Sequence, residues 1–344
     1  MSASDTIIYT DQEWKTFFSD LSYSKLIVLT DDQTQKHCLP IFQAHLHGHE
    51  FLHINVKGGE KSKSIDNAQY VWKKLLNAAI DRDAILICLG GGVVSDLGGY
   101  AASCYKRGIR LINVPTTHLA MTDAALGGKN AINFGGLKNQ IGTVLPPIVV
   151  WINTAFLSSL PKRELLSGWV ETVKHALIAD REFWNIIRVT PIDDLILDNE
   201  VLKKSALIKN AIAAQDPMDK GIRQALNFGH TIGHALEANS KLLHGEAIAF
   251  GLLAESYLSN KICGLPEDDL YAISTYLQCY KDPLSGAQID HHALIDRMSN
   301  DKKNLNGRVR FSLIANIGEP KVGLNATLEQ MESAISFAKK QLLT

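Results

Sequence analysis

The 344-residue sequence predicts an α/β N-terminal domain built on a Rossmann-like parallel sheet, followed by a mainly α-helical C-terminal domain. In the first half, short continuous aliphatic runs alternate with helix-like stretches, which is typical of strands buried on both faces of a parallel sheet. From about residue 160, long amphipathic stretches replace the aliphatic runs. We therefore expect two domains, at 1–160 and 161–344, which also agrees with the usual size of domains.

The individual elements follow from these patterns in chain order. The predicted strands are 25–31, 51–56, 84–92, 110–115 and 147–152. Apolar residues recur at helical spacing between Ala68 and Ala79, and Ser64 is placed to cap that helix. The second half predicts helices at 164–178, 202–214 and 233–260, and one strand at 308–318.

Composition excludes several classes of protein. Lys plus Arg number 35 and Asp plus Glu 36, so no global basic footprint exists for nucleic acid or an anionic membrane. The five cysteines form no C-x-x-C motif, which favours a reducing compartment. The N-terminus lacks the features of a signal peptide, and no run of 18 apolar residues occurs. We expect a cytoplasmic protein that binds neither nucleic acid nor membrane.

A glycine-rich turn follows the predicted strand at 84–92. Gly90, Gly91 and Gly92 lead into a helix, where small residues let backbone N–H groups approach a phosphate. The spacing is not G-x-G-x-x-G, so a simple tight turn is the alternative. Asp96, one turn further on, is equally compatible with a surface residue that compensates the helix dipole.

The segment 113–147 carries five glycines and few charges, which predicts a long functional loop. Its polar groups Asp123, Lys129, Lys138 and Asn139 are suited to a phosphorylated ligand. An ordinary surface loop is the alternative, although such a loop would more often carry mixed solvating charges.

A histidine cluster at 227–246 suggests a metal site. His230 and His234 are four residues apart, so a helix would place them on one face, and His244 follows ten residues later. Glu171 lies in an otherwise apolar helical stretch, where burial would be costly unless it were paired or bound to metal. Two His and one carboxylate form the open pattern of a catalytic zinc site, whereas each histidine alone would more simply be a structural one. Lys174, Lys209, Arg223, Lys302 and Lys303, taken singly, are compatible with solvated surface charges.

Taken in order, these motifs resemble the 3-dehydroquinate synthase family. The resemblance covers 58–304 and includes GGGVVSDLGGYAA, YKRGI, PTTHLAMTDAALGGK, LKNQIGT, SGWVETVKHALI, NFGHTIGHALE and HGE. It implies a homodimer with NAD bound in 1–160, and with a zinc or cobalt ion and substrate bound in 161–344. The implied substrate is a small phosphorylated sugar acid, 3-deoxy-arabino-heptulosonate 7-phosphate. The implied reaction in the shikimate pathway is transient oxidation by NAD, β-elimination of phosphate, re-reduction and intramolecular aldol closure to 3-dehydroquinate.

The resemblance also implies roles for individual residues. Glu171, His230 and His244 match metal ligands, and His234 matches an active-site histidine that is not a ligand, which replaces the pairing suggested by spacing. Residues matching catalytic or substrate-binding positions are Arg107, Asp123, Lys129, Asn139, Lys174, Lys209, Arg223 and Asn227, of which Arg107 is a candidate for supply by the neighbouring subunit. Residues matching nucleotide-binding positions are Asp31, Glu60, Lys63, Gly91, Gly92, Val93, Asp96, Thr116, Thr117, Asp123, Lys129, Lys138 and Asn139. The register of Lys302 against Lys303 is left open.

The sequence departs from the family pattern at Ala124 and Ala125, where serines are common, and at Asn130, where threonine is usual. These departures bear on the choice of substrate more than on the chemistry. Three alternatives therefore stay open: another sugar-phosphate cyclase, a metal-dependent polyol dehydrogenase that releases NADH, and a non-catalytic metal-binding relative. Arg223 and Lys209 favour a substrate with a carboxylate over the first alternative. The further cations, such as Lys129 and Lys174, exceed what an uncharged alcohol requires.

Overall fold

The computed structural model describes residues 6–238, 240–299 and 309–343, so Lys302 and Lys303 lie outside the described residues. The chain forms two compact units. Unit 1 comprises Met1–Pro161 and Leu202–Asn210, and unit 2 comprises Lys162–Val201 and Ala211–Thr344. The sequence did not suggest that Leu202–Asn210, in the middle of a long helix, would belong to the first unit.

Unit 1 is built on a six-stranded sheet in which the described strand pairings are parallel. Its strands, in spatial order, are β1 (Ile7–Ile8), β8 (Val149–Trp151), β5 (Arg110–Pro115), β4 (Ile85–Gly90), β2 (Leu26–Asp31) and β3 (Phe51–Val56). Five of them match the predicted aliphatic runs, so the predicted parallel α/β sheet is confirmed. Because the strands are parallel, the turns after β2, β4 and β5 lie at the same edge of the sheet, where ligands of such folds bind.

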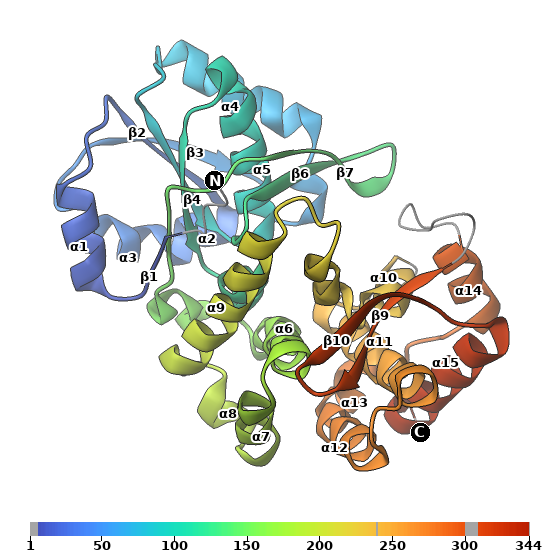
Figure 1. Cartoon of the computed structure of the whole chain (residues 1–344). Helices are drawn as coiled ribbons and strands as arrows, with labels where there is room; N and C mark the ends of the chain where they lie inside the picture. Colours follow the sequence, from blue (N-terminus) through green and yellow to red (C-terminus); the bar gives the residue numbers. More distant parts are fainter. Residues whose placement is uncertain (1–5, 239, 300–308, 344) are drawn as a thin grey trace. The chain divides into compact units, whose positions relative to one another are not determined.

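Helices cover both faces of this sheet (Figure 1). Leu86 is in register with Ile27 and Leu111, and all three belong to one buried cluster with residues of α4 (Ile65–Asn77) and α5 (Gly92–Cys104). On the other face, Trp151 of β8 stacks on Trp14, with ring centroids 4.5 Å apart. Trp14 belongs to α1 (Asp11–Ser19), which is followed along the chain by α2 (Asp32–His37) and α3 (Leu39–Ala44). The predicted cap of α4 is also confirmed, because Ser64 Oγ accepts a hydrogen bond from the Asn67 N–H.

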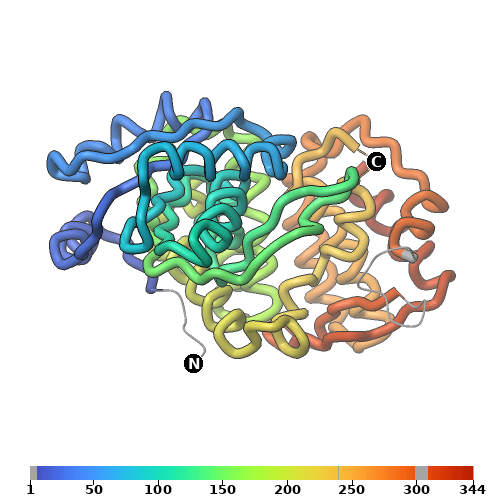
Figure 2. Tube along the Cα trace, turned by 90° about the horizontal axis from the view of Figure 1, so that it is seen from above, coloured from blue at the N-terminus to red at the C-terminus, as the bar shows by residue number. Residues whose placement is uncertain are grey.

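The prediction of one long loop over 113–147 is wrong. Strands β6 (Lys129–Phe134) and β7 (Leu137–Val144) pair there as an antiparallel hairpin. The turn residues Gly135 and Gly136 have φ of 60° and 79°, a conformation that favours glycine. The hairpin extends away from the six-stranded sheet as an arm in both Figure 1 and Figure 2. Sequence reasoning missed it because β7 is largely exposed and shows no apolar run.

Unit 2 is mainly helical, as predicted. Its helices are α6 (Lys162–Ala179), α7 (Arg181–Val189), α8 (Ile192–Leu195), α10 (His230–Glu237), α11 (His244–Leu258), α12 (Glu267–Leu277), α13 (Lys281–Leu284), α14 (His291–Ser299) and α15 (Leu328–Leu343), while α9 (Asn199–Gln215) belongs to both units. Helix α11 is buried along nearly its whole length and packs against α6, α10, α12 and α15. The strand predicted at 308–318 is found as β9 (Arg310–Asn316), which pairs with β10 (Glu319–Asn325).

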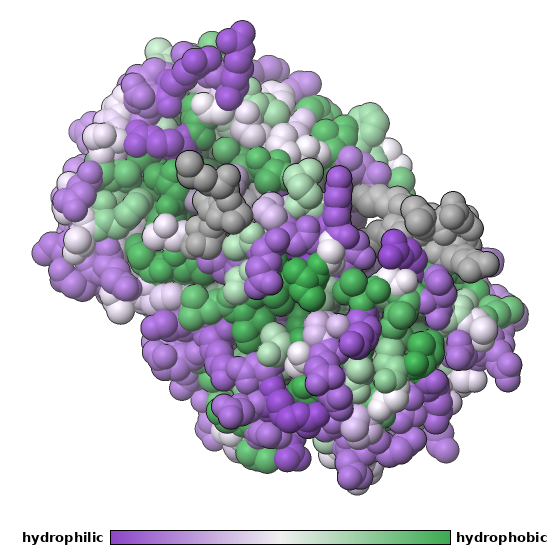
Figure 3. All heavy atoms as spheres, in the orientation of Figure 1, coloured by the Kyte–Doolittle hydropathy of each residue, from purple (hydrophilic) through white to green (hydrophobic). Residues whose placement is uncertain are grey.

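The single helix predicted over 233–260 is also wrong. The chain leaves the helical conformation after α10 and begins a new helix at His244, so His230 and His244 each occupy the first position of a helix. Among the described residues, no helix is long and apolar enough to cross a membrane. In Figure 3, hydrophilic side chains are spread over the visible face of each unit, interspersed with smaller apolar areas.

Candidate functional site

The glycine-rich turn of unit 1 joins β4 to the N-terminus of α5. Gly91 occupies the N-cap position without a side-chain cap, and the first turn of α5 contains no acidic residue. The positive end of the helix dipole is therefore not compensated locally, which suits an anion. Added Cβ atoms at Gly91 and Gly92 would lie 3.0 Å from Thr117 and 3.1 Å from Ala124, so a side chain at either position would require its neighbour to shift by a few tenths of an ångström. Val93 follows in the same first turn, and Thr116 donates its backbone N–H to the Gly90 carbonyl.

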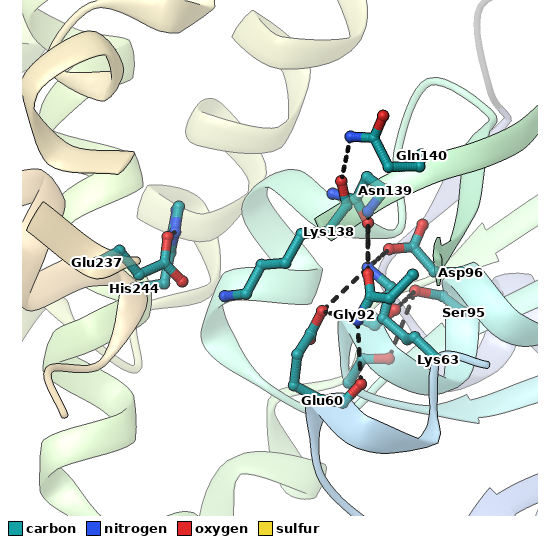
Figure 4. Close-up of polar contacts among 12 residues, drawn as sticks. Glu60, Lys63, Gly92, Ser95, Asp96, Lys138, Asn139, Gln140, Glu237 and His244 are labelled. Carbon is teal, nitrogen blue, oxygen red and sulfur yellow. Dashed lines mark hydrogen bonds and ion pairs between the residues drawn. The ribbon is translucent and has the colours of Figure 1, made fainter. Parts of the chain in front are cut away.

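A buried lysine organises the polar groups beside this turn (Figure 4). Lys63 Nζ donates to Asp96 Oδ2 and to Asn139 Oδ1, each at 2.6 Å, and lies 3.8 Å from a carboxylate oxygen of Glu60. Asn133, which the sequence did not single out, donates to Glu60 Oε1 and accepts the backbone N–H of Asn139. Asp96 therefore belongs to a fixed polar cluster and is not a solvated surface residue. Burial raises the pKa of Asp96 to about 6, although the charge of Lys63 opposes that rise.

The remaining predicted residues of unit 1 are distributed around its sheet. Lys209 Nζ donates to Asp123 Oδ1 at 2.6 Å, which joins α9 to the turn after β5. Asp31 caps α2 by accepting the N–H groups of Gln33 and Thr34. Lys129 and Lys138 lie exposed on the β6–β7 hairpin.

Arg107 is separated from these groups. It is exposed and follows the C-terminal end of α5, whose N-terminal end carries the glycine turn. A helix of 13 residues at 1.5 Å per residue places about 20 Å between its two ends. The structure therefore does not bring Arg107 together with the other predicted residues of its own unit.

Two of the departures from the family pattern are explained by packing. Asn130 is buried, and its amide donates to the carbonyls of Gly128 and Leu145. An added Cβ at Gly99 would lie 1.8 Å from Asn130 Oδ1, so this asparagine and Gly99 depend on each other. Ala124 packs beside Gly92 in a turn of π-helix.

Unit 2 brings together Glu171 from α6, His230 from α10 and His244 from α11. Glu171 Oε1 lies 3.5 Å from His230 Nε2 and 3.4 Å from His244 Nε2. This oxygen is buried and accepts no hydrogen bond from the described residues. Tetrahedral ligation by zinc at about 2.1 Å would separate neighbouring ligand atoms by about 3.4 Å. The donor set and its spacing therefore fit a divalent cation.

The outer nitrogen of each of these histidines has a partner. His230 Nδ1 is 3.1 Å from the Phe228 carbonyl, and His244 Nδ1 is 3.2 Å from Glu237 Oε2 (Figure 4). Such partners fix the ring orientation and leave each Nε2 facing Glu171 Oε1. His234, whose ring centroid is 5.0 Å from that of His230, lies beside the cluster, as does Glu237.

The surrounding charges and burial hold two of the three groups in the protonation state that binds a cation. Burial opposes ionisation of Glu171, but the adjacent Lys174 ammonium, which hydrogen-bonds its Oε2, holds the pKa well below its usual value. Burial and the same charge hold the pKa of His230 well below its usual value, so this imidazole is neutral. For His244, burial is outweighed by the carboxylates of Glu171 and Glu237, which raise the pKa to about 9.

The starts of both histidine helices are fixed by buried carboxylates that the sequence analysis overlooked. Glu255 accepts the N–H groups of Gly229 and Ile232 at the start of α10. Glu246 accepts the N–H of Leu243 at the start of α11. Glu255 stands alone in the apolar run of α11, the same signal that singled out Glu171, and could have been found by it.

The last two predicted residues of unit 2 lie in one turn. Arg223 and Asn227 belong to the 3-10 turn Ile222–Asn227, immediately before α10. Arg223 is buried and donates to the carbonyl of Pro217, and its backbone N–H is held by Asp216. This turn therefore presents a buried guanidinium close in sequence to His230.

Comparison with known proteins identifies the family. The family models described as 3-dehydroquinate synthase N-terminal and 3-dehydroquinate synthase C-terminal match residues 53–167 and 168–304. A 3-dehydroquinate synthase of Parabacteroides distasonis is 37% identical over 99% of both chains. Among solved structures, 2-epi-5-epi-valiolone synthase of Streptomyces hygroscopicus, with NAD+ and Zn2+ bound, has a TM-score of 0.87 at 23% identity over 98% of both chains. A 2-deoxy-scyllo-inosose synthase, complexed with carbaglucose-6-phosphate, NAD+ and Co2+, has a TM-score of 0.84 at 24% identity over 96% of this chain and 95% of that one. The fold and the full-length identity lead to one conclusion: this chain belongs to the 3-dehydroquinate synthase family.

Proposed function

We propose that this protein is a 3-dehydroquinate synthase, which converts 3-deoxy-arabino-heptulosonate 7-phosphate to 3-dehydroquinate and inorganic phosphate. The observation that carries the proposal is the buried cluster of Glu171, His230 and His244 in a chain of this family. The reaction is a net elimination and ring closure, so the nucleotide is used and restored within each turnover.

Glu171, His230 and His244 would hold the divalent metal, zinc or cobalt. When bound, such an ion supplies Lewis-acid polarisation of substrate hydroxyl oxygens. The protein contributes the orientation of its ligands: Glu237 and the Phe228 carbonyl hold the outer nitrogens of the two imidazoles. Lys174 neutralises the inner carboxylate oxygen and thereby keeps Glu171 ionised in a buried setting.

The glycine turn and the Lys63 cluster would hold NAD, which supplies a hydride acceptor and donor when bound. The uncompensated N-terminus of α5, with Gly91, Gly92 and Val93, suits its pyrophosphate. Asp31, at the carboxyl end of β2, is proposed to accept a hydrogen bond from a ribose hydroxyl. The other groups proposed for the nucleotide are Glu60, Lys63, Asp96, Thr116 and Thr117.

Cationic side chains are proposed to bind the anionic groups of the substrate. Lys209 and Arg223 are proposed for the carboxylate, and Lys129, Lys138 and Asn139 for the phosphate. His234, which lies beside the metal ligands, is proposed to move a proton. Asp123 orients the Lys209 ammonium through their ion pair. Lys174 and Asn227 complete the proposed set.

We also propose a homodimer in a reducing, cytoplasmic compartment. Arg107 lies at the opposite end of α5 from the glycine turn. This position agrees with the proposal that each subunit supplies its Arg107 to the site of the other. All five cysteines are free, as a reducing compartment requires. Mixing Arg107→Ala with Glu171→Gln protein tests the shared site: hybrid dimers should regain activity, whereas a subunit that needs no partner residue would show no such gain.

The function is tested by identifying the product. Protein supplied with NAD, Zn2+ and the heptulosonate phosphate should form 3-dehydroquinate, detected by mass spectrometry. Glucose 6-phosphate and sedoheptulose 7-phosphate, which lack the carboxylate, should not be converted. Conversion of either one in place of the heptulosonate would instead identify another sugar-phosphate cyclase.

A further inference from the structure

Three residues on one side of α6 contact three successive residues in the first turn of α11. Arg163, Ser167 and Glu171 are four residues apart, so they lie along one side of α6. Their partners at the start of α11 run in the opposite order: Glu246 for Arg163, Gly245 for Ser167, and His244 for Glu171. The contact between the two proposed metal ligands is thus the last of three successive contacts between α6 and α11. The first of these contacts, Arg163 with Glu246, lies outside the proposed metal site.

The first two of these contacts are short, directional hydrogen bonds. Arg163 Nε and Nη2 donate to Glu246 Oε1 at 2.5 Å and to Oε2 at 2.7 Å, a bidentate pair. The backbone N–H of Gly245 donates to Ser167 Oγ at 3.0 Å. An added Cβ at Gly245 would lie 1.9 Å from the Ser167 carbonyl oxygen, so the two backbones touch and leave little room for sliding.

Glu246 transmits the position of Arg163 to His244. Its side chain is 1% exposed, and Oε2 also accepts the N–H of Leu243, the residue before His244. The same carboxylate therefore binds the last backbone N–H before α11 and also the guanidinium on α6. A buried carboxylate bound in this way cannot move without giving up charged hydrogen bonds.

We propose that Arg163, acting through Glu246, is a positioning residue that sets the separation of Glu171 and His244 and thereby the affinity of the metal site. The proposal rests on the metal site proposed above but not on the identity of the substrate. Arg163 touches neither ligand. Its effect comes from holding α6 in register with the start of α11, so that the two ligand atoms lie 3.4 Å apart.

The chain offers a matched control. Arg181 on α7 forms a bidentate pair with Asp269 on α12, at 3.0 and 2.8 Å, within the same unit. The Arg181 side chain is 44% exposed and that of Arg163 55%, and their carboxylate partners are 14% and 1% exposed, so each removal leaves a mostly buried carboxylate without its guanidinium. Neither Arg181 nor Asp269 lies on a helix that carries a proposed ligand. A general loss of packing would affect both variants alike.

The test measures Co2+ binding to the metal-free protein by competition with a chelator, together with the visible spectrum of the bound cobalt. Arg163→Met should weaken Co2+ binding roughly tenfold, within the range found when groups behind metal ligands are removed, and should alter the spectrum. Arg163→Lys keeps one charged hydrogen bond and should recover part of the affinity. Arg181→Met should match wild type in both readouts, while thermal unfolding shows that both Met variants fold.

Each outcome bears on a different claim. Wild-type affinity and spectrum for Arg163→Met would overturn the positioning role and leave the metal site standing. Equal losses in Arg163→Met and Arg181→Met would also overturn it, because the effect would then be general. Failure of the wild-type protein to bind Co2+ would remove the metal site itself, and the positioning role with it.

Discussion

Glu171 Oε1 lies 3.5 Å from His230 Nε2, buried and without a hydrogen bond from the described residues, although the two residues belong to different helices. Lys174 pairs with the other carboxylate oxygen of Glu171, but a buried oxygen without a hydrogen bond of its own is costly unless something else binds it. A divalent cation removes that cost.

Glu171→Gln should lose bound metal and activity together, because an amide is a poor zinc ligand and no longer balances the charge of Lys174. Elemental analysis of the purified protein measures the first and product formation the second. Glu164→Gln, an exposed position on the same helix, is the control and should keep both. Full metal content in Glu171→Gln would sink the ligand assignment.

Lys209→Met should lower kcat/KM for the heptulosonate phosphate roughly 10- to 100-fold, the usual effect of losing a hydrogen bond to a charged group. Lys203→Met is the control, because Lys203 lies on the same helix but stacks over Tyr9. Steady-state kinetics measure both. Equal, small effects in the two variants would mean that Lys209 does not meet the substrate.

The pKa of Asp96, raised by burial to about 6 from an ordinary value of 3.8, predicts a pH dependence of stability. Because the folded-state pKa is the higher one, the protonated carboxyl favours the fold below about pH 4, and this contribution is lost as the pH rises through 6. The free energy of unfolding of Asp96→Asn should therefore gain on wild type by up to about 3 kcal/mol between pH 4 and 7. Urea unfolding at several pH values measures it, and a constant difference would contradict the shift.

Lys63→Met should raise the pKa of Asp96 further, since the Lys63 ammonium is the main group that lowers it. Carbon-13 NMR of the labelled aspartate carboxyls follows the titration. An unchanged or lower midpoint in Lys63→Met would show that the Lys63 ammonium does not stabilise the Asp96 carboxylate in solution.

Gly99→Ala should destabilise the protein by about 1–3 kcal/mol, because the new methyl group collides with the Asn130 amide. Asn130→Ala removes the obstacle, so the double variant should lose less than the sum of the two single variants. A double-mutant cycle of unfolding free energies measures the coupling. Strict additivity would mean that the two positions are independent, and Asn130 would again be open as a determinant of substrate choice.

Much of the fold follows from the sequence, because buried parallel strands must be continuously apolar: Ile85 to Leu89 is such a run, and it forms the centre of the sheet. The β6–β7 hairpin could not be predicted in this way, because β7 is held by backbone pairing and carries mostly exposed side chains. The helix break before His244 also escapes local patterns. Glu246 accepts the Leu243 N–H where α11 begins and also pairs with Arg163 on α6, a long-range contact that no periodicity reveals.

Residues of the candidate site were predictable where the residue type is unusual for its position. Examples are Glu171 within an apolar helix and Gly91 immediately before a helix. Spacing alone suggested His230 with His234, whereas the fold directs His244 to Glu171 instead. The supporting groups Asn133 and Glu237 were missed because their importance lies in contacts that no local pattern shows, whereas Glu255 carries the same signal as Glu171.

The most direct test of the central claim compares phosphate released with NADH formed in one reaction. Protein with NAD, Zn2+ and the heptulosonate phosphate should release one phosphate for each 3-dehydroquinate, while NADH does not accumulate beyond the enzyme concentration. Steady accumulation of NADH without phosphate release would contradict the account and identify a dehydrogenase.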